Sequence, residues 1–83
     1  MLFTPLTIGN LKLANRIVVS PMCQYSALNG VMNEWHLQHI TQLALSGAGL
    51  VMIESTAIEK VGRITHYCTG LYDTKCEFSI KSV

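Results

Sequence analysis

The sequence predicts an α/β fold in which a β-hairpin precedes a strand–helix–strand unit. Two continuous apolar runs, Ile17-Val18-Val19 and Gly49 to Ile53, have the composition of strands buried on both faces of a parallel sheet. Between them, apolar residues recur at helical spacing, which fits the crossover that parallel strands require. The 83 residues, of which 49% are hydrophobic and 13% charged, are typical of a globular chain of at most one domain.

A hairpin is expected over Leu2 to Leu13. The stretches Leu6-Thr7-Ile8 and Leu11-Lys12-Leu13 flank Gly9-Asn10, and Gly-Asn is a signal for a two-residue hairpin turn. The next strand, at Ile17-Val18-Val19, is expected to end at Pro21, which lacks an amide donor.

A helix is expected to begin after Asn33 and to stop at Gly47. Asn33 is a good N-cap, and Glu34 lies where the helix dipole favours an anion. The apolar stripe of this helix would consist of Leu37, Ile40, Leu43 and Ala44. The loop of residues 22–33 is longer than most strand-to-helix connections, which indicates a functional loop.

Two polar strand exits are expected to share one ligand crevice. Because parallel strands run the same way, Ser20 to Tyr25 and Glu54 to Ala57 emerge at the same edge of the sheet, where α/β folds bind ligands. Cys23 offers a polarisable weak donor there, and Tyr25 offers a phenol. On the residues alone, Cys23 also fits a buried core cysteine.

Seven short blocks of the sequence, taken together, carry a family resemblance. The blocks that carry it, besides Ser20-Pro21-Met22-Cys23-Gln24-Tyr25, are Leu2-Phe3-Thr4-Pro5, Asn15-Arg16-Ile17-Val18, Trp35-His36-Leu37, Gly47-Ala48-Gly49-Leu50, Glu54-Ser55-Thr56-Ala57 and Gly62-Arg63-Ile64-Thr65. In order and spacing they resemble the amino-terminal part of the old yellow enzyme family, and most closely its bacterial, cysteine-containing branch of NADPH dehydrogenases. The resemblance covers residues 2–73.

The resemblance implies a (β/α)₈ TIM barrel that binds FMN, takes hydride from NAD(P)H and delivers it to the β-carbon of an activated alkene such as an enone. It implies that the flavin contacts are Ser20, Pro21, Met22, Cys23 and Ser55. The Ser55 contact would run through its backbone, Cys23 would tune the flavin potential, and Tyr25 would hydrogen-bond the substrate. Complete members of the family are expected to be homo-oligomers.

The chain is expected to supply only part of such a barrel, which takes about 250 residues. Residues 1–73 would be the amino-terminal portion of the FMN-binding domain, and residues 74–83 a divergent tail without a helical stripe, alternating weakly at Phe78 and Ile80. The family's substrate-binding histidines are not matched by any histidine of this chain. We therefore expect a truncated product or a partial gene, inactive alone.

Two other functions remain open. One is a non-catalytic module that pairs its exposed strands with another chain by β-augmentation. The other is a different FMN barrel, for example of the dihydroorotate dehydrogenase kind, which the Ser20 to Tyr25 block and Gly62-Arg63-Ile64-Thr65 disfavour.

Charge and cysteine content limit which partners and which cellular compartment are expected. The net charge is +1 and the six basic residues do not cluster, so neither nucleic acid nor a membrane surface is an expected partner. Three cysteines without a CxxC pair argue against a disulfide scaffold or a zinc site and favour a reducing cytoplasm. His36 and His39 lack a third metal ligand, so helix packing or a solvated helix face is expected for them.

Overall fold

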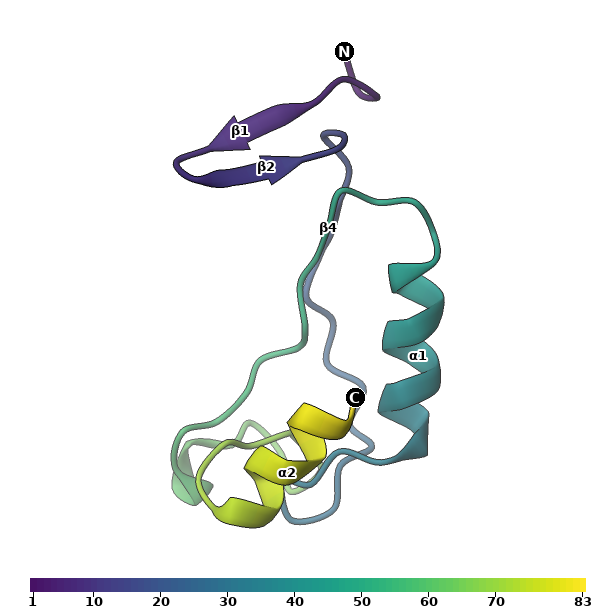
Figure 1. The fold of residues 1–83 in the computed structure, drawn as a ribbon. Coiled ribbons are helices and arrows are strands. Elements are labelled where there is room, and N and C mark those ends of the chain that lie inside the picture. Colours follow the sequence, from purple (N-terminus) through teal and green to yellow (C-terminus); the bar gives the residue numbers. More distant parts are fainter.

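A computed structural model describes residues 1–83. The elements in chain order are β1 (Leu6–Ile8), β2 (Leu11–Leu13), β3 (Val18–Val19), α1 (Glu34–Ala44), β4 (Leu50–Val51), the short 3₁₀ helix η1 (Lys60–Gly62) and α2 (Thr74–Ser82). The hairpin stands at one end of an elongated chain of 41 × 25 × 21 Å, whereas α2 and the long loops gather at the other end (Figure 1).

The predicted hairpin is confirmed. Strands β1 and β2 pair antiparallel with Leu6 opposite Leu13 and Ile8 opposite Leu11. Gly9 adopts a φ of 57°, which lies in the left-handed region that glycine enters at little cost. The hairpin therefore turns where the sequence predicts.

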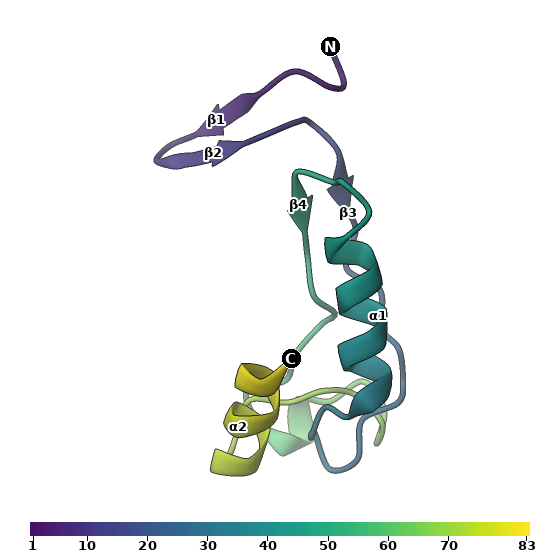
Figure 2. The same ribbon diagram turned by 45° about the vertical axis from the view of Figure 1, so that its right-hand side comes forward.

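The predicted strand–helix–strand unit is also confirmed. Strands β3 and β4 pair parallel, with Val18 opposite Leu50 and Val19 opposite Val51, and α1 runs alongside both (Figure 2). Each strand is only two residues long, shorter than the apolar run around it. The unit nevertheless places both strand exits at the same end of the pair.

Helix α1 begins as predicted, and its one buried residue is a histidine. The side chain of Asn33 accepts a hydrogen bond from the Trp35 amide, and the helix ends at Ala44, before Gly47 with its φ of 93°. His36 is the one buried residue of α1, whereas Leu37 is 43% exposed. The predicted stripe of Leu37, Ile40, Leu43 and Ala44 lies on this helix but is not a buried face within this chain.

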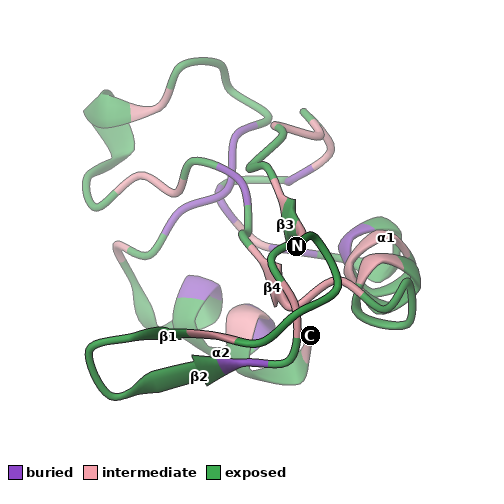
Figure 3. Cartoon of the chain, turned by 90° about the horizontal axis from the view of Figure 1, so that it is seen from above, coloured by how far each residue is buried: buried purple, intermediate pink, exposed green.

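Apart from Leu13 in β2, the buried residues lie in the loops that follow β3 and β4 and in helices α1 and α2. Only 11 of 83 residues are buried, and Figure 3 shows the buried segments around these loops while the hairpin is almost wholly exposed. The buried hydrophobic residues are Leu13, Ala27, Met32, Cys68 and Cys76. The core therefore supports the strand exits.

The tail forms a helix, which corrects the expectation of weak alternation without a helix. Asp73 is the N-cap of α2, and its carboxylate accepts a hydrogen bond of 2.8 Å from the Cys76 amide. The buried residues of α2 are Cys76 and Ser79. Because serine is not apolar, this helical face does not produce a hydrophobic stripe.

Candidate functional site

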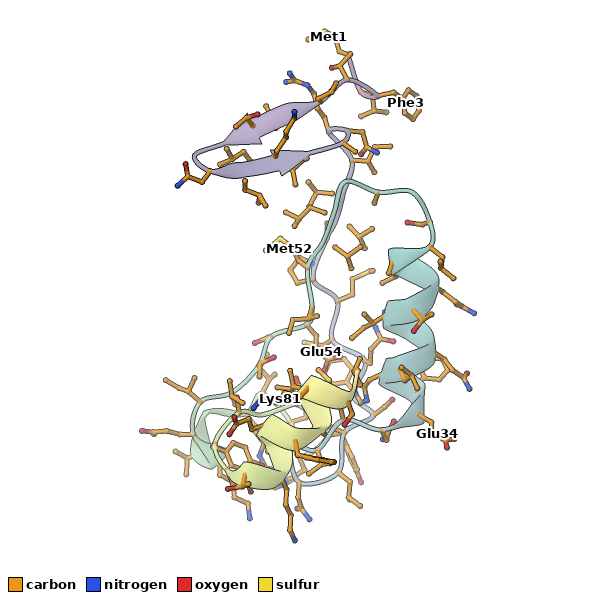
Figure 4. The ribbon with its side chains drawn as sticks, in the orientation of Figure 1. Met1, Phe3, Glu34, Met52, Glu54 and Lys81 are labelled. Carbon is orange, nitrogen blue, oxygen red and sulfur yellow. The ribbon has the colours of Figure 1, made fainter.

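The two strand exits leave the same end of the β3–β4 pair. The Met52 amide donates to the Val19 carbonyl at 3.2 Å, just past the paired residues of both strands. Ser20 to Tyr25 then follows β3, and Glu54 and Ser55 follow β4. Met52 itself follows β4, projects on the side away from α1 and is 48% exposed (Figure 4).

The first exit presents free backbone donors. Ser20, Pro21 and Met22 are exposed, and Cys23 is half-buried. The backbone amides of Met22 and Cys23 donate no hydrogen bond within the chain. These donors can therefore bond the carbonyl and nitrogen acceptors of a flat heterocycle, next to a thiol.

Tyr25 stands at a strained position of the same exit. Its φ is 52°, in the left-handed region that few bulky residues adopt, and its side chain is 53% exposed. Such backbone strain is concentrated at functional sites. The phenol is accessible to a ligand.

Gln24 fixes the first exit to the start of α1. Its side-chain oxygen accepts from the Trp35 indole at 3.0 Å, and its amide nitrogen donates to the Met22 carbonyl at 2.9 Å. The Trp35 ring is also stacked on His39, with ring centroids 6.3 Å apart. Trp35 thus lies at the helix start and remains 52% exposed.

The side chain of Thr69 is hydrogen-bonded to the backbone of the second exit. Ser55 is exposed and its amide makes no hydrogen bond within the chain, whereas its carbonyl accepts from the Thr69 hydroxyl at 3.2 Å. Thr69 is fully buried and also contacts the Thr56 hydroxyl at 3.3 Å. The Ser55 amide is therefore free to bind a ligand, while the Ser55 carbonyl is held in place by Thr69.

The loops beyond the two exits are hydrogen-bonded to each other. The Ala27 amide donates to the Tyr67 carbonyl, and the Gly70 amide donates to the Gly30 carbonyl, both at 3.0 Å. Arg63, left without a role by the sequence, closes its own loop by donating to the carbonyls of Lys60 and His66. These contacts join the two exits into one surface.

Sequence reasoning missed a buried pair, His36 and Glu54. Nε2 of His36 lies 3.7 Å from a carboxylate oxygen of Glu54, and Figure 4 shows Glu54 where the chain leaves β4. Burial lowers the pKa of His36, against the opposing effect of the Glu54 carboxylate. Two signals existed: a glutamate directly after an apolar strand, and a histidine three residues after the N-cap Asn33.

No helix of the chain is both long and apolar enough to span a membrane.

Known proteins are similar to this chain in sequence and in fold. The chain is 44% identical over 71 residues to an NADH:flavin oxidoreductase of Gibberella zeae, covering 86% of this chain and 17% of that protein. It is 42% identical over 74 residues to an NADPH dehydrogenase of Listeria welshimeri, covering 87% of this chain and 22% of that protein. Among solved structures, morphinone reductase in complex with tetrahydroNAD superposes with a TM-score of 0.81 and 32% identity, over 96% of this chain and 22% of that one.

These matches establish the fold and the family together. The chain spans about a fifth of the length of the curated relatives it matches, and its hairpin and βαβ unit are part of a TIM barrel. The profile of one family of FMN-dependent oxidoreductases matches residues 1–77, which reaches into α2. The chain belongs to the NADH:flavin oxidoreductase / NADH oxidase family.

Proposed function

We propose that Ser20, Pro21, Met22, Cys23 and Ser55 form one wall of an FMN site in an enzyme that reduces activated alkenes with NAD(P)H. The observation that carries this proposal is the set of unbonded amides at Met22, Cys23 and Ser55, at two neighbouring parallel strand exits. Ligands of α/β barrels bind at this end of the strands. The donors fit the polar edge of a flavin ring, so the residues present fit the cofactor.

Cys23 and Tyr25 have different proposed roles. The half-buried Cys23 thiol would lie against the flavin and adjust its potential through a weak hydrogen bond. The exposed Tyr25 phenol would donate to the carbonyl oxygen of an enone and polarise the alkene. When bound, FMN supplies two-electron redox chemistry, by which alkene, NAD(P)H and a proton become saturated product and NAD(P)⁺.

The complete reaction is proposed for a whole enzyme, because the chain spans about a fifth of its relatives. We expect the isolated 83-residue chain not to oxidise NADPH. Three free cysteines accord with the reducing cytoplasm that we propose as its location.

A chimera tests the proposed function. Residues 2–73 of this chain would replace the corresponding segment of the Listeria welshimeri NADPH dehydrogenase, to which this chain is 42% identical. We expect a yellow protein that consumes NADPH and cyclohexenone in equal amounts, and a Tyr25→Phe chimera with about 10²-fold lower kcat for the enone. Tyr67→Phe is the matched control, because Tyr67 is exposed outside the two exits. A folded chimera that binds FMN but leaves the alkene intact would refute the ene-reductase assignment.

A second candidate function is strand pairing with another chain. Each of β3 and β4 has a single partner, Val18 in β3 is 47% exposed, and Met52 just after β4 is 48% exposed. Unpaired apolar strand edges are templates for β-augmentation. Co-expression with an affinity-tagged relative tests this function. A stoichiometric complex that is lost in the Val18→Lys variant would support it. Recovery of the untagged chain alone, without the tagged relative, would refute it.

A further inference from the structure

A continuous series of contacts connects the two strand exits through the start of α1. Glu54 faces His36 at 3.7 Å, and Nδ1 of His36 accepts from the Asn33 amide at 3.1 Å. The Asn33 side chain donates to the Ser26 carbonyl at 2.6 Å. The Ser26 hydroxyl in turn donates to the Gln24 carbonyl at 2.9 Å. The series begins next to Ser55 and ends next to Cys23.

The contacts of Nδ1 bear on which nitrogen of His36 carries the proton. Nδ1 accepts from the Asn33 amide at 3.1 Å and also lies 3.2 Å from the side-chain oxygen of Asn33. We assign the tautomer from the shorter contact, with the lone pair on Nδ1 and the hydrogen of the neutral ring on Nε2. Nε2 is the atom that faces Glu54. The ring therefore presents a donor to the carboxylate while it completes the capping box of α1.

Both members of the pair carry a buried polar atom without a hydrogen bond. His36 is fully buried and Glu54 is 7% exposed. Nε2 of His36 faces Oε2 of Glu54 and makes no hydrogen bond, and neither does the second carboxylate oxygen, Oε1. A buried carboxylate is costly unless a donor or a positive charge faces it. His36 is that group, so the position of Glu54 depends on the position of α1.

We propose that Glu54 and His36 are positioning residues that fix the two halves of the flavin wall relative to each other. This inference rests on the proposed function, since it concerns the geometry of that wall. Glu54 sets the path of the backbone into Ser55, and His36 transmits that position through Asn33 to the loop that follows Cys23. Neither side chain is expected to touch the flavin or the substrate.

Protonation of His36 would change this series at Asn33. A second proton goes to Nδ1, which can then no longer accept from the Asn33 amide and instead faces the Asn33 side-chain oxygen at 3.2 Å as a donor. Burial has the largest effect on the pKa of His36 and lowers it. Of the ionisable groups that act on His36, Glu54 from the β4 exit raises this pKa and His39 from α1 lowers it. The hydrogen bond from the Asn33 amide to His36 is therefore present at neutral pH and lost in acid.

The test uses the full chain, labelled with ¹⁵N, with FMN as the probe. In Glu54→Ala we expect the amide signals of Gln24 and Ser26 to shift, and the dissociation constant for FMN to rise at least about fivefold. His36→Gln is the conservative variant, because glutamine at this position keeps the capping box and offers an N–H to Glu54. It should restore wild-type signals and remove their pH dependence. His66→Gln, a change in an exposed loop, should alter neither.

Glu54→Gln keeps the side-chain volume, so this variant replaces Glu54→Ala in the test if Glu54→Ala does not fold. Removing the carboxylate charge should move the titration of the His36 ring to lower pH, because that charge raises its pKa. The inference is wrong if Gln24 and Ser26 are unmoved in Glu54→Ala, or if the His36 titration is unchanged in Glu54→Gln. If the wild-type chain does not bind FMN, the proposed function fails, while the amide signals still decide the coupling.

Discussion

The side chain of Asn15 joins the beginnings of the two parallel strands at Gly49. Its side-chain oxygen accepts from the Gly49 amide at 2.8 Å and from the Ile17 amide at 3.0 Å, and its nitrogen donates to the Gly47 carbonyl at 2.7 Å. A Cβ at Gly49 would collide with the Asn15 carbonyl and approach its side-chain oxygen at 2.9 Å. The strands can therefore align only where residue 49 has no side chain.

Gly49→Ala is expected to destabilise the chain by about 1 to 3 kcal/mol, because backbone atoms of Asn15 must move to admit the methyl group. Urea unfolding followed by circular dichroism measures the change. Gly62→Ala is the control, since no atom lies within 4 Å of a Cβ at Gly62, and it should change stability by less than about 0.5 kcal/mol. Equal effects of the two substitutions would contradict the close approach of the strands.

Ser79→Ala is expected to loosen α2 from the core. The Ser79 hydroxyl accepts from the buried Met32 amide at 3.0 Å, so its removal leaves that amide unpaired and costs about 1 to 3 kcal/mol. Ser82→Ala is the matched control, because Ser82 is exposed and bonds only the Phe78 carbonyl within its own helix. Hydrogen exchange at Met32 checks the prediction, and protection equal to wild type in Ser79→Ala would contradict it.

The same serine explains why α2 could not be predicted from the sequence. The hairpin, the Asn33 cap and the parallel strands carry patterns that local chemistry determines, such as Gly9-Asn10 and two continuous apolar runs. The inward face of α2 instead relies on Cys76 and Ser79, whose burial depends on a loop far away in the sequence. His36 was missed for a similar reason, because its partner Glu54 is 18 residues away.

Acid is expected to weaken the start of α2. Hydrogen bonds from the Cys76 amide lower the pKa of Asp73 below its ordinary value of 3.8, so the folded state binds this proton less readily than the unfolded state. The contribution of the cap to the free energy of unfolding is complete above pH 3.8. It is lost as the pH falls through the lower pKa that Asp73 has in the folded state. Asp73→Asn should keep the cap without titrating, and the amide shift of Cys76 between pH 5 and pH 2 reports the difference. An unchanged acid response in this variant would show that another group is responsible.

Tyr25→Gly is expected to leave the fold intact or stabilise it by up to about 1 kcal/mol. Glycine adopts the φ of 52° without strain, and the ring that is removed is 53% exposed. Tyr67→Gly, at a similarly exposed tyrosine with an ordinary φ, should instead destabilise the chain by about 0.5 to 1 kcal/mol. Thermal unfolding of both variants measures the contrast. A loss of stability in Tyr25→Gly as large as in Tyr67→Gly would mean that the backbone at Tyr25 is not strained.

The central claim is that the two strand exits bind FMN, and a residue-resolved titration tests it most directly. The ¹⁵N-labelled chain would be titrated with FMN, with riboflavin as a second probe for the ring alone. We predict that the amide signals of Met22, Cys23 and Ser55 shift together along one binding curve, because these donors are free in the chain and lie at neighbouring strand ends. Shifts confined to other residues, or none at these three amides up to saturating FMN, would contradict the claim.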